Sequence, residues 1–367
     1  MRIGIDASNL RAGGGVTHLV ELLRNADPTR HGVSEVIVWS GASTLSRLPK
    51  DQPWLRLEHV AELDRSLPWR MAWRRFRLPR LARGRCDMLF HPGGGRCSFR
   101  PAVTMCRNMI PFQWREMRRY GVRYLFWRAL ALHFVLLSAF RKSDGLIFVS
   151  EFARERIEPK LPRRVRTEVI PHGVSDRFRV APRTVKQDGE LRLLYTSLID
   201  EYKHQWTVAD AVMRLRRDGV PVSIDLVGPS YPPARRKLDA VLARAGDERA
   251  AVRVRDEVSH DEVAELARRA DAFVFASTCE NMPNILIEAM AAGLPIACSN
   301  RRPMSDILKD GGVYFDPEDA DDIARVLRGF IADPELRAAK AQRAYELALE
   351  LSWERCADRT FAFLARW

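Results

Sequence analysis

The sequence has few of the features that mark secreted or membrane-spanning proteins. Its six cysteines include no Cys-x-x-Cys pair and no metal-ligand spacing, so we expect them to be reduced and buried rather than joined in disulfides. No apolar run reaches the ~18 residues that a membrane span needs. The start of the chain turns polar too soon for a signal peptide. We therefore expect a cytosolic protein without a transmembrane segment.

Signatures of metal and dinucleotide sites are also missing. No Asp-x-Asp pair stands at a strand end in a setting that suits a metal, and the acidic run 316–322 is typical of the first turn of a helix. A complete G-x-G-x-x-G is absent, although Gly13, Gly14 and Gly15 follow the first predicted strand. We expect no bound metal ion and no cofactor.

Composition and charge are more informative. Among the 367 residues, 46% are hydrophobic and 29% are charged, which is typical of a globular chain with room for two domains. Residues 1–180 hold 33 Lys and Arg against 16 Asp and Glu, a net charge of +17, whereas the remainder holds 27 against 31, a net charge of −4. The first half therefore suits an anionic surface or ligand, and the second does not.

Short apolar runs alternate with amphipathic helical patterns along the whole chain. This alternation predicts an α/β protein with parallel sheets. The stretch 175–190 has no sustained periodicity and is the best linker. We predict two Rossmann-like domains facing a cleft: residues 1–178, residues 190–350, and a tail helix at 351–367 that returns to the first domain.

One segment of the second domain combines a strand, a loop and a helix with two carboxylates. The apolar run 272–276 predicts a buried strand, and the pattern from Ile285 to Ala292 predicts a helix ended by Gly293 and Pro295. Glu280 then lies in the loop at the carboxyl end of the strand, and Glu288 near the second turn of the helix. Open parallel sheets bind their ligands at this edge.

This segment resembles the E-x7-E element of retaining glycosyltransferases of the GT-B fold, glycosyltransferase family 4. The resemblance is specific over residues 190–315 and plausible over the whole length. It is supported by the Gly-rich loop at 13–15, by Ile170-Pro-His-Gly-Val174, by Tyr202-Lys203 and by Gly311-Gly-Val-Tyr-Phe-Asp-Pro317.

The resemblance implies a role for each matching residue. Glu288 would accept hydrogen bonds from the ribose hydroxyls, Glu280 would hold the donor sugar near its reacting carbon, and Lys203 would stabilise the leaving diphosphate. Gly14 and Gly15 would let the backbone approach the donor. Further donor-binding positions are Ser197, Asn281, Met282, Pro283, Asn284 and Ile285. The leaving phosphate itself can take the acceptor proton, so that no protein base is needed.

Several positions in both predicted domains depart from the family pattern. Many relatives carry His-Asp where this chain has Arg107-Asn108, and the family's Arg several residues ahead of Lys203 is absent. Arg107 could substitute as a phosphate ligand and is the third predicted catalytic residue beside Glu280 and Lys203, and Asn108 could substitute as a hydroxyl partner. His91 lines the acceptor side by its position, and His172 is expected to be a hydrogen-bonded hinge residue. Pro283 lacks an amide donor, which Asn281 or Asn284 replaces.

Residues 67–85 and 114–142 mix Arg with Trp and Phe on predicted helices. This mixture suits an anionic membrane surface, although a solvated Arg face on core helices gives the same pattern; nucleic acid is disfavoured because no binding motif is present.

We predict a metal-independent hexosyltransferase (mannose-type or related), peripheral on the inner face of the cell membrane. It would act on a nucleotide sugar and a lipid-linked glycan of surface polysaccharide or lipopolysaccharide. A nucleotide-sugar epimerase or hydrolase of the same fold, or a non-catalytic assembly protein, remains an alternative. The sugar, base, linkage and oligomeric state stay open.

Overall fold

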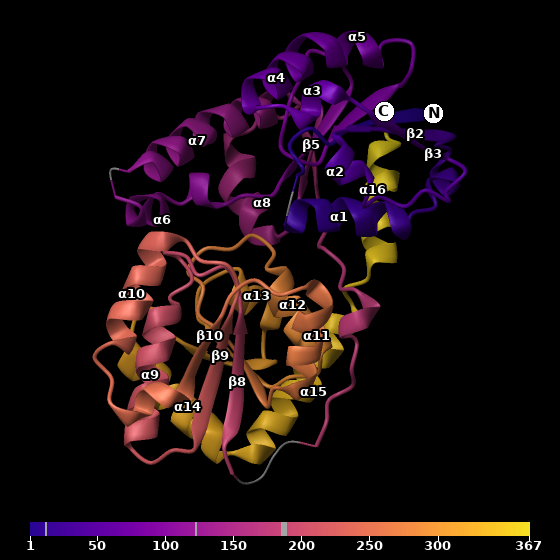
Figure 1. Ribbon diagram of the computed structural model, residues 1–367. Coiled ribbons are helices and arrows are strands. Elements are labelled where there is room, and N and C mark those ends of the chain that lie inside the picture. The colour runs from indigo at the N-terminus through magenta and orange to yellow at the C-terminus, as the bar shows by residue number, and fades with distance from the viewer. Residues whose placement is uncertain (12, 122, 185–188) are drawn as a thin grey trace. The chain divides into compact units, whose positions relative to one another are not determined.

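Two parallel sheets organise the computed structural model, which describes residues 1–11, 13–121, 123–184 and 189–367 (Figure 1). The chain divides into two units. Unit 1 comprises Met1–Phe112, Tyr124–Gly173 and Leu351–Trp367, and unit 2 comprises Gln113–Arg123 and Val174–Glu350. Each unit is built on one sheet with helices between its strands, so the predicted α/β class with two Rossmann-like domains is confirmed.

The sheet of unit 1 has seven strands in the order β3-β2-β1-β4-β5-β6-β7, all paired in parallel. Its central strands are buried along almost their whole length, because helices pack on a parallel sheet from both faces. In chain order the strands are Arg2–Asp6, Glu35–Ser40, Leu55–His59, Met88–His91, Ala102–Cys106, Gly145–Phe148 and Arg166–Val169. The helices are α1 Gly14–Arg24, α2 Ala42–Leu45, α3 Ala61–Asp64, α4 Leu67–Ala72, α5 Leu78–Ala82, α7 Tyr124–Lys142, α8 Glu151–Ile157 and α16 Trp353–Leu364.

The sheet of unit 2 has six strands in the order β10-β9-β8-β11-β12-β13, again all parallel. In chain order from β8 they are Leu191–Thr196, Val222–Val227, Val252–Arg255, Ala272–Phe275, Ile296–Ser299 and Gly312–Phe315. The helices are α6 Trp114–Arg119, α9 Gln205–Arg217, α10 Pro232–Leu242, α11 His260–Arg269, α12 Asn284–Ala291, α13 Met304–Leu308, α14 Ala320–Ala332 and α15 Pro334–Leu349.

The strand orders place a topological switch point in each unit. Connections run outward in opposite directions from β1 and β4 in unit 1, and from β8 and β11 in unit 2. The loops that follow such a pair of strands diverge and leave a crevice at the carboxyl edge of the sheet. In unit 2 these loops carry Lys203 and Glu280.

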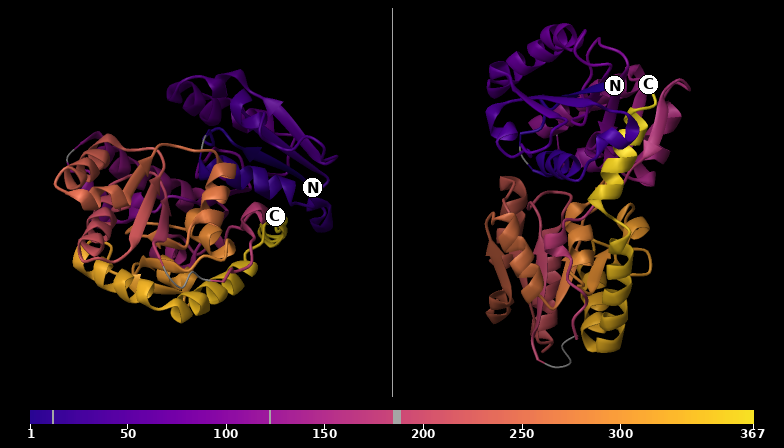
Figure 2. Two further views of the ribbon diagram at one scale, coloured as in Figure 1. Left: turned by 60° about the horizontal axis from the view of Figure 1, so that its bottom comes forward. Right: turned by 90° about the vertical axis from the view of Figure 1, so that its right-hand side faces the viewer.

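The C-terminal helix α16 lies in unit 1, where it packs beside α1 (Figure 2). The chain leaves unit 1 after Gly173 and returns at Leu351, and the two crossing points touch. A Cβ on Gly173 would lie 2.2 Å from the backbone nitrogen of Trp353, so only glycine fits there.

Two boundaries differ from those expected from the sequence. Unit 2 begins at Val174 rather than near 190, and the segment Gln113–Arg123 belongs to unit 2 although it lies within the basic first half of the chain. The basic stretch 114–142 is therefore split between the units. Periodicity alone could not reveal this, because a short amphipathic helix gives no indication of which sheet it packs on.

The helix α7 bears on the expectation that no segment is long and apolar enough to span a membrane. Its 19 residues are long and apolar enough to cross a membrane, judged by length and composition alone, and 17% of its apolar window is buried. A count of consecutive apolar residues misses it because Arg128 interrupts the run. Several of its large side chains are exposed: Tyr124, Trp127, Phe134 and Val135.

Candidate functional site

Lys203 and Glu280 form an ion pair at the switch point of unit 2. Lys203 follows β8 and Glu280 follows β11, so two strands that are neighbours in the sheet bring together residues 77 positions apart. The side chains are 6% and 14% exposed, respectively. The Ser277 hydroxyl donates to Oε1 of Glu280 over 2.7 Å, which fixes the carboxylate further. The structure thus joins two of the three predicted catalytic residues.

Aromatic rings and backbone contacts hold Lys203 in place. Its ammonium lies 4.9 Å from the centre of the Phe275 ring and 5.2 Å from that of Tyr202, within the range of cation–π attraction. The Tyr195 hydroxyl donates to the carbonyl of Lys203 over 2.7 Å. Burial raises the pKa of Tyr195 well above its usual value, so this phenol stays a neutral donor.

Glu288 lies in the second turn of α12 and has a partner that the sequence analysis missed. Nε2 of His260, at the start of α11, lies 3.0 Å from Oε1 of Glu288. The Ser259 hydroxyl caps α11 by accepting from the Glu262 amide over 3.1 Å, and this cap sets the position of His260. No fixed spacing links His260 to Glu288, since the two residues lie on different helices.

Two other predicted donor residues have buried polar atoms without hydrogen-bond partners in the described part of the chain. These atoms are Oγ of Ser197 and Oδ1 of Asn284. Nearly all buried polar atoms in proteins are paired, so unpaired atoms beside the Lys203 and Glu280 loops favour a site completed by a ligand. Pro283 is the N-cap of α12 rather than its first residue, and Asn281 is buried.

In unit 1, Arg107 supports the Gly-rich loop. Its guanidinium donates to the carbonyl oxygens of Gly14 over 2.7 Å and Gly15 over 3.5 Å. Burial lowers the pKa of Arg107 to about 10, so it stays charged at neutral pH. Asn108 is exposed, and its Oδ1 accepts from the Ile110 amide over 3.0 Å, which closes a local turn.

His91, which was expected to line the acceptor side, is buried in unit 1. It is 1% exposed, and its Nδ1 lies 2.9 Å from Oδ2 of Asp6. Burial opposes the charge on His91, but the hydrogen bond and negative charge of Asp6 outweigh it and raise the pKa of His91 to about 9. The ring of His91 thus packs against the carboxylate at the end of β1.

His172 is hydrogen-bonded next to the crossing point, as expected for a hinge residue. Its Nδ1 lies 3.0 Å from Nδ1 of His18, and its ring stacks on Trp353 with centroids 5.9 Å apart. Burial and the positive charge of Arg107 lower the pKa of His172 to about 3, and burial lowers the pKa of His18 well below its usual value, so both rings of the pair are neutral.

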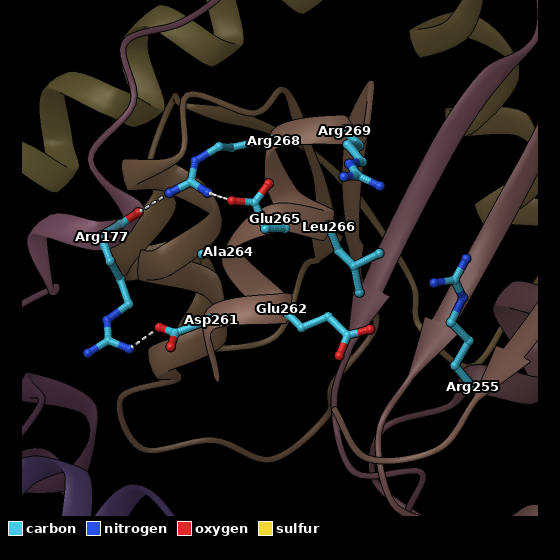
Figure 3. A pocket seen from close by; sticks show the side chains of 9 residues that line it. All are labelled: Arg177, Arg255, Asp261, Glu262, Ala264, Glu265, Leu266, Arg268 and Arg269. Atoms are coloured by element: carbon cyan, nitrogen blue, oxygen red, sulfur yellow. Dashed lines mark hydrogen bonds and ion pairs between the residues drawn. The ribbon is translucent and has the colours of Figure 1, made fainter. Parts of the chain in front are cut away.

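A pocket of about 560 Å³ lies elsewhere in unit 2, along α11 (Figure 3). Several of its charged side chains pair with one another: Arg177 binds Asp261 over 2.7 Å, and Arg268 binds Glu265 and the carbonyl of Arg177. It contains none of the predicted donor residues, so we do not assign the donor to it.

Comparison with known proteins matches both halves of the chain to glycosyltransferases. Residues 12–178 match the family described as Glycosyltransferase Family 4, and residues 176–347 match Glycosyl transferases group 1. O-antigen chain mannosyltransferase B of Escherichia coli is 29% identical over 119 residues, which is 32% of this chain and 31% of that protein. A glycogen synthase of Mycobacterium tuberculosis is 28% identical over 227 residues, 60% of this chain and 53% of that protein.

The matched regions thus span about a third to a half of the length of these curated relatives. Among solved structures, HepE of Anabaena in complex with UDP-glucose aligns with a TM-score of 0.73 and 15% identity over 99% of this chain and 100% of that one. At this identity the likeness establishes the fold.

Proposed function

Since the chain belongs to the group 1, family 4 glycosyltransferases of the GT-B fold, we propose that it transfers a hexose from a nucleotide diphosphate sugar, with retention of configuration, to a lipid-linked glycan. The main support for the donor-binding site is the Lys203–Glu280 ion pair at the switch point of unit 2, with Glu288 on the helix that follows Glu280. Open α/β sheets bind nucleotides at this place.

The proposed roles follow from charge and geometry. Lys203 neutralises the diphosphate as it leaves, and it shares its charge with Glu280 until the donor arrives. Glu280 holds the sugar and stabilises the positive charge that develops on the ring in the transition state. Glu288 and His260 contact the ribose. The Glu288 carboxylate is already paired with His260, and its remaining acceptor positions can bind the two neighbouring ribose hydroxyls.

We propose that the reaction needs no divalent metal. The leaving phosphate takes the acceptor proton on the face from which it departs, and Lys203 supplies the positive charge.

The acceptor part rests on the surface of unit 1. Large apolar side chains are exposed on two of its basic segments: Leu67, Trp69, Met71, Phe76, Tyr124, Trp127, Phe134 and Val135. Helices that mix such residues with arginine bind anionic bilayers in the interface. We therefore place the protein on the cytoplasmic face of the membrane, where a lipid-linked glycan is within reach, and the similarity to an O-antigen mannosyltransferase favours a surface polysaccharide.

Calorimetric titration with a panel of nucleoside diphosphates and their hexose conjugates tests the donor assignment. We expect one nucleotide to bind and its hexose conjugate to bind at the same site. Absence of binding by every compound would instead indicate a non-catalytic assembly protein. The anomeric configuration of the transferred sugar, read by proton NMR, tests retention, and an inverted product would contradict it.

Vesicle flotation tests the membrane assignment. We expect the protein to float with vesicles containing anionic lipid and to stay behind with purely zwitterionic ones. Equal flotation with both compositions would contradict an electrostatic contact.

A further inference from the structure

The short helix α6 and its flanks contact both loops of the proposed donor site. We propose that the segment Gln113–Arg123, called the strap below, holds the Lys203 loop and the Glu280 loop in register, with Glu116 as its main positioning residue. The inference rests on the proposed function, and it assigns to this site a segment from the other half of the sequence. The strap belongs to unit 2, so all of these contacts lie within one unit.

The strap binds the Glu280 loop through Glu116. Oε2 of Glu116 accepts from the Thr278 hydroxyl over 2.8 Å, two residues before Glu280. Next to it, the Gln113 side-chain amide lies 3.2 Å from the sulfur of Cys279. Burial raises the pKa of the Cys279 thiol well above its usual value, so this cysteine is a packing group and not a nucleophile.

The strap binds the Lys203 loop through Tyr120. Its hydroxyl donates to Oδ1 of Asp200 over 3.2 Å, and the same oxygen accepts from the Glu201 amide over 2.7 Å. The Tyr120 ring also packs edge-on against Tyr231, with centroids 5.9 Å apart. A six-residue helix with its flanks thus reaches loops that follow two different strands, β8 and β11.

Glu116 is the centre of a directional hydrogen-bond chain. It is 4% exposed, and Nε of Arg119 donates to it over 2.7 Å. Thr278 gives its one hydroxyl proton to Glu116, and its oxygen lies 3.4 Å from Nε2 of His204, the residue after Lys203. Burial lowers the pKa of His204 to about 3, so this ring is neutral. The chain therefore runs from the Lys203 turn through Thr278 to the strap.

A second anchor fixes the far side of α6. Arg119 and Arg115 bind the two carboxylate oxygens of Glu318, over 2.8 and 2.6 Å, and Glu318 lies in the loop after β13. An isolated helix of this length is not stable in water. These contacts, together with the buried side chains of Glu116, Met117 and Tyr120, hold it at the carboxyl edge of the sheet.

A positioning role differs from a merely structural one in what it changes. A structural contact contributes to the free energy of unfolding. A positioning contact restricts the loops that carry Lys203 and Glu280, and misplacement of catalytic groups by about 1 Å lowers turnover by about 100-fold. Since Glu116 does not touch the proposed substrate, its removal should affect turnover more than donor affinity.

The test compares Glu116→Gln and Thr278→Val with Thr278→Ser, which keeps the hydroxyl. We expect kcat to fall about 10- to 30-fold in the first two variants, with the KM for the nucleotide sugar changed less than threefold, and to be nearly normal in Thr278→Ser. The double variant Glu116→Gln, Thr278→Val should be no slower than the slower single variant, because both act on the same bond: Gln leaves only a neutral acceptor, and Val removes the donor. The matched control is Glu265→Gln, which breaks an i,i+3 Glu–Arg pair of the same kind on α11 and should leave kcat unchanged.

Amide hydrogen exchange provides a readout that does not depend on activity. Exchange in 198–204 and 277–281 should rise at least tenfold in Glu116→Gln and stay normal in Glu265→Gln. Unchanged amide exchange in Glu116→Gln would contradict the positioning role of the strap. A lower melting temperature with unchanged kcat would contradict it as well. If the wild type transfers no sugar while the exchange result holds, the proposed function fails and the strap stands.

Discussion

The two units share the same strand order around their switch points, but the ion pairs that form there differ in solvent exposure. In each, the pair of strands at the switch point brings an ion pair together: Asp6 and His91 are the last residues of β1 and β4, and Lys203 and Glu280 lie in the loops after β8 and β11. Both side chains of the first pair are 2% exposed, whereas those of the second are 6% and 14% exposed. The same topology therefore produces a sealed pair in unit 1 and a pair that solvent reaches in unit 2.

This difference separates stability from function. A fully buried ion pair cannot contact a ligand, and removing one of its two residues leaves the charge of the other uncompensated. A pair that solvent reaches keeps acceptor and donor capacity for a ligand, as the unpaired atoms of Ser197 and Asn284 nearby also suggest. Disrupting the two pairs should thus have different consequences.

Breaking the sealed pair should have the largest effect. The substitution His91→Ala leaves the Asp6 carboxylate buried without its partner and should lower the free energy of unfolding by about 3–5 kcal/mol. Urea denaturation at pH 7 measures this. The remaining folded protein should bind the nucleotide sugar with normal affinity in calorimetry, and weaker binding would place His91 in the donor site.

Breaking the solvent-reached pair should affect turnover. Glu280→Gln keeps the shape of the side chain and should lower kcat by about 100- to 1,000-fold, the usual loss when one transition-state contact is removed. Initial rates of sugar transfer measure it, alongside urea denaturation to show normal folding. A fully active, folded variant would remove Glu280 from the chemistry.

The free energy of unfolding should depend on pH through the His91–Asp6 pair of unit 1. The folded-state pKa of His91 is raised to about 9, so its stabilisation is complete below its unfolded value near 6.5 and is lost as pH rises to 9. At about 1.36 kcal/mol per pH unit over 2.5 units, the loss is on the order of 3 kcal/mol. Urea denaturation between pH 6.5 and 9 should show this decline in the wild type and not in His91→Ala.

The ribose contacts should show a moderate effect. Glu288→Gln removes a charged acceptor, and hydrogen bonds to charged groups contribute about 1.5–3 kcal/mol. We expect the dissociation constant of the nucleoside diphosphate to rise about 10- to 100-fold in calorimetry, with a smaller rise in His260→Gln. If Glu288→Gln weakened the sugar conjugate but not the free nucleotide, Glu288 would contact the sugar instead.

The smallest effect concerns the surface of unit 1. Arg75 is exposed beside Phe76, with its guanidinium 5.6 Å from the ring centre. Arg75→Gln should weaken flotation with anionic vesicles about fivefold, because one basic residue contributes about 1 kcal/mol. The matched control is Arg216→Gln in unit 2, an exposed arginine that should have no effect. Equal losses in both variants would point to a general charge effect.

Prediction from the sequence succeeded where a local pattern carries the information. The apolar runs at 2–6 and 272–276 form the strands β1 and β11, and Glu280 lies in the loop that follows β11. The helix before Gly293 was expected at 285–292 and runs from Asn284 to Ala291. Such features depend on neighbours in the chain, so periodicity and turn residues reveal them.

Prediction failed where the partner lies far away in the sequence. His260, Glu116 and Tyr120 were not identified, since each reaches the site from a helix that no spacing rule connects to it. His91 was expected to line the acceptor side because of its position, and the carboxylate that pairs with it comes from another strand. The split of 114–142 between two units was likewise invisible to charge and hydropathy.

The sequence by itself determined the α/β alternation and the two sheets, because backbone geometry and apolar periodicity act over a few residues. Only the tertiary structure decided which charges meet. It paired Lys203 with Glu280 and Asp6 with His91, and it assigned the strap to unit 2. The physical reason is that burial and Coulomb attraction depend on distance in space, which the strand order sets and the local sequence does not express.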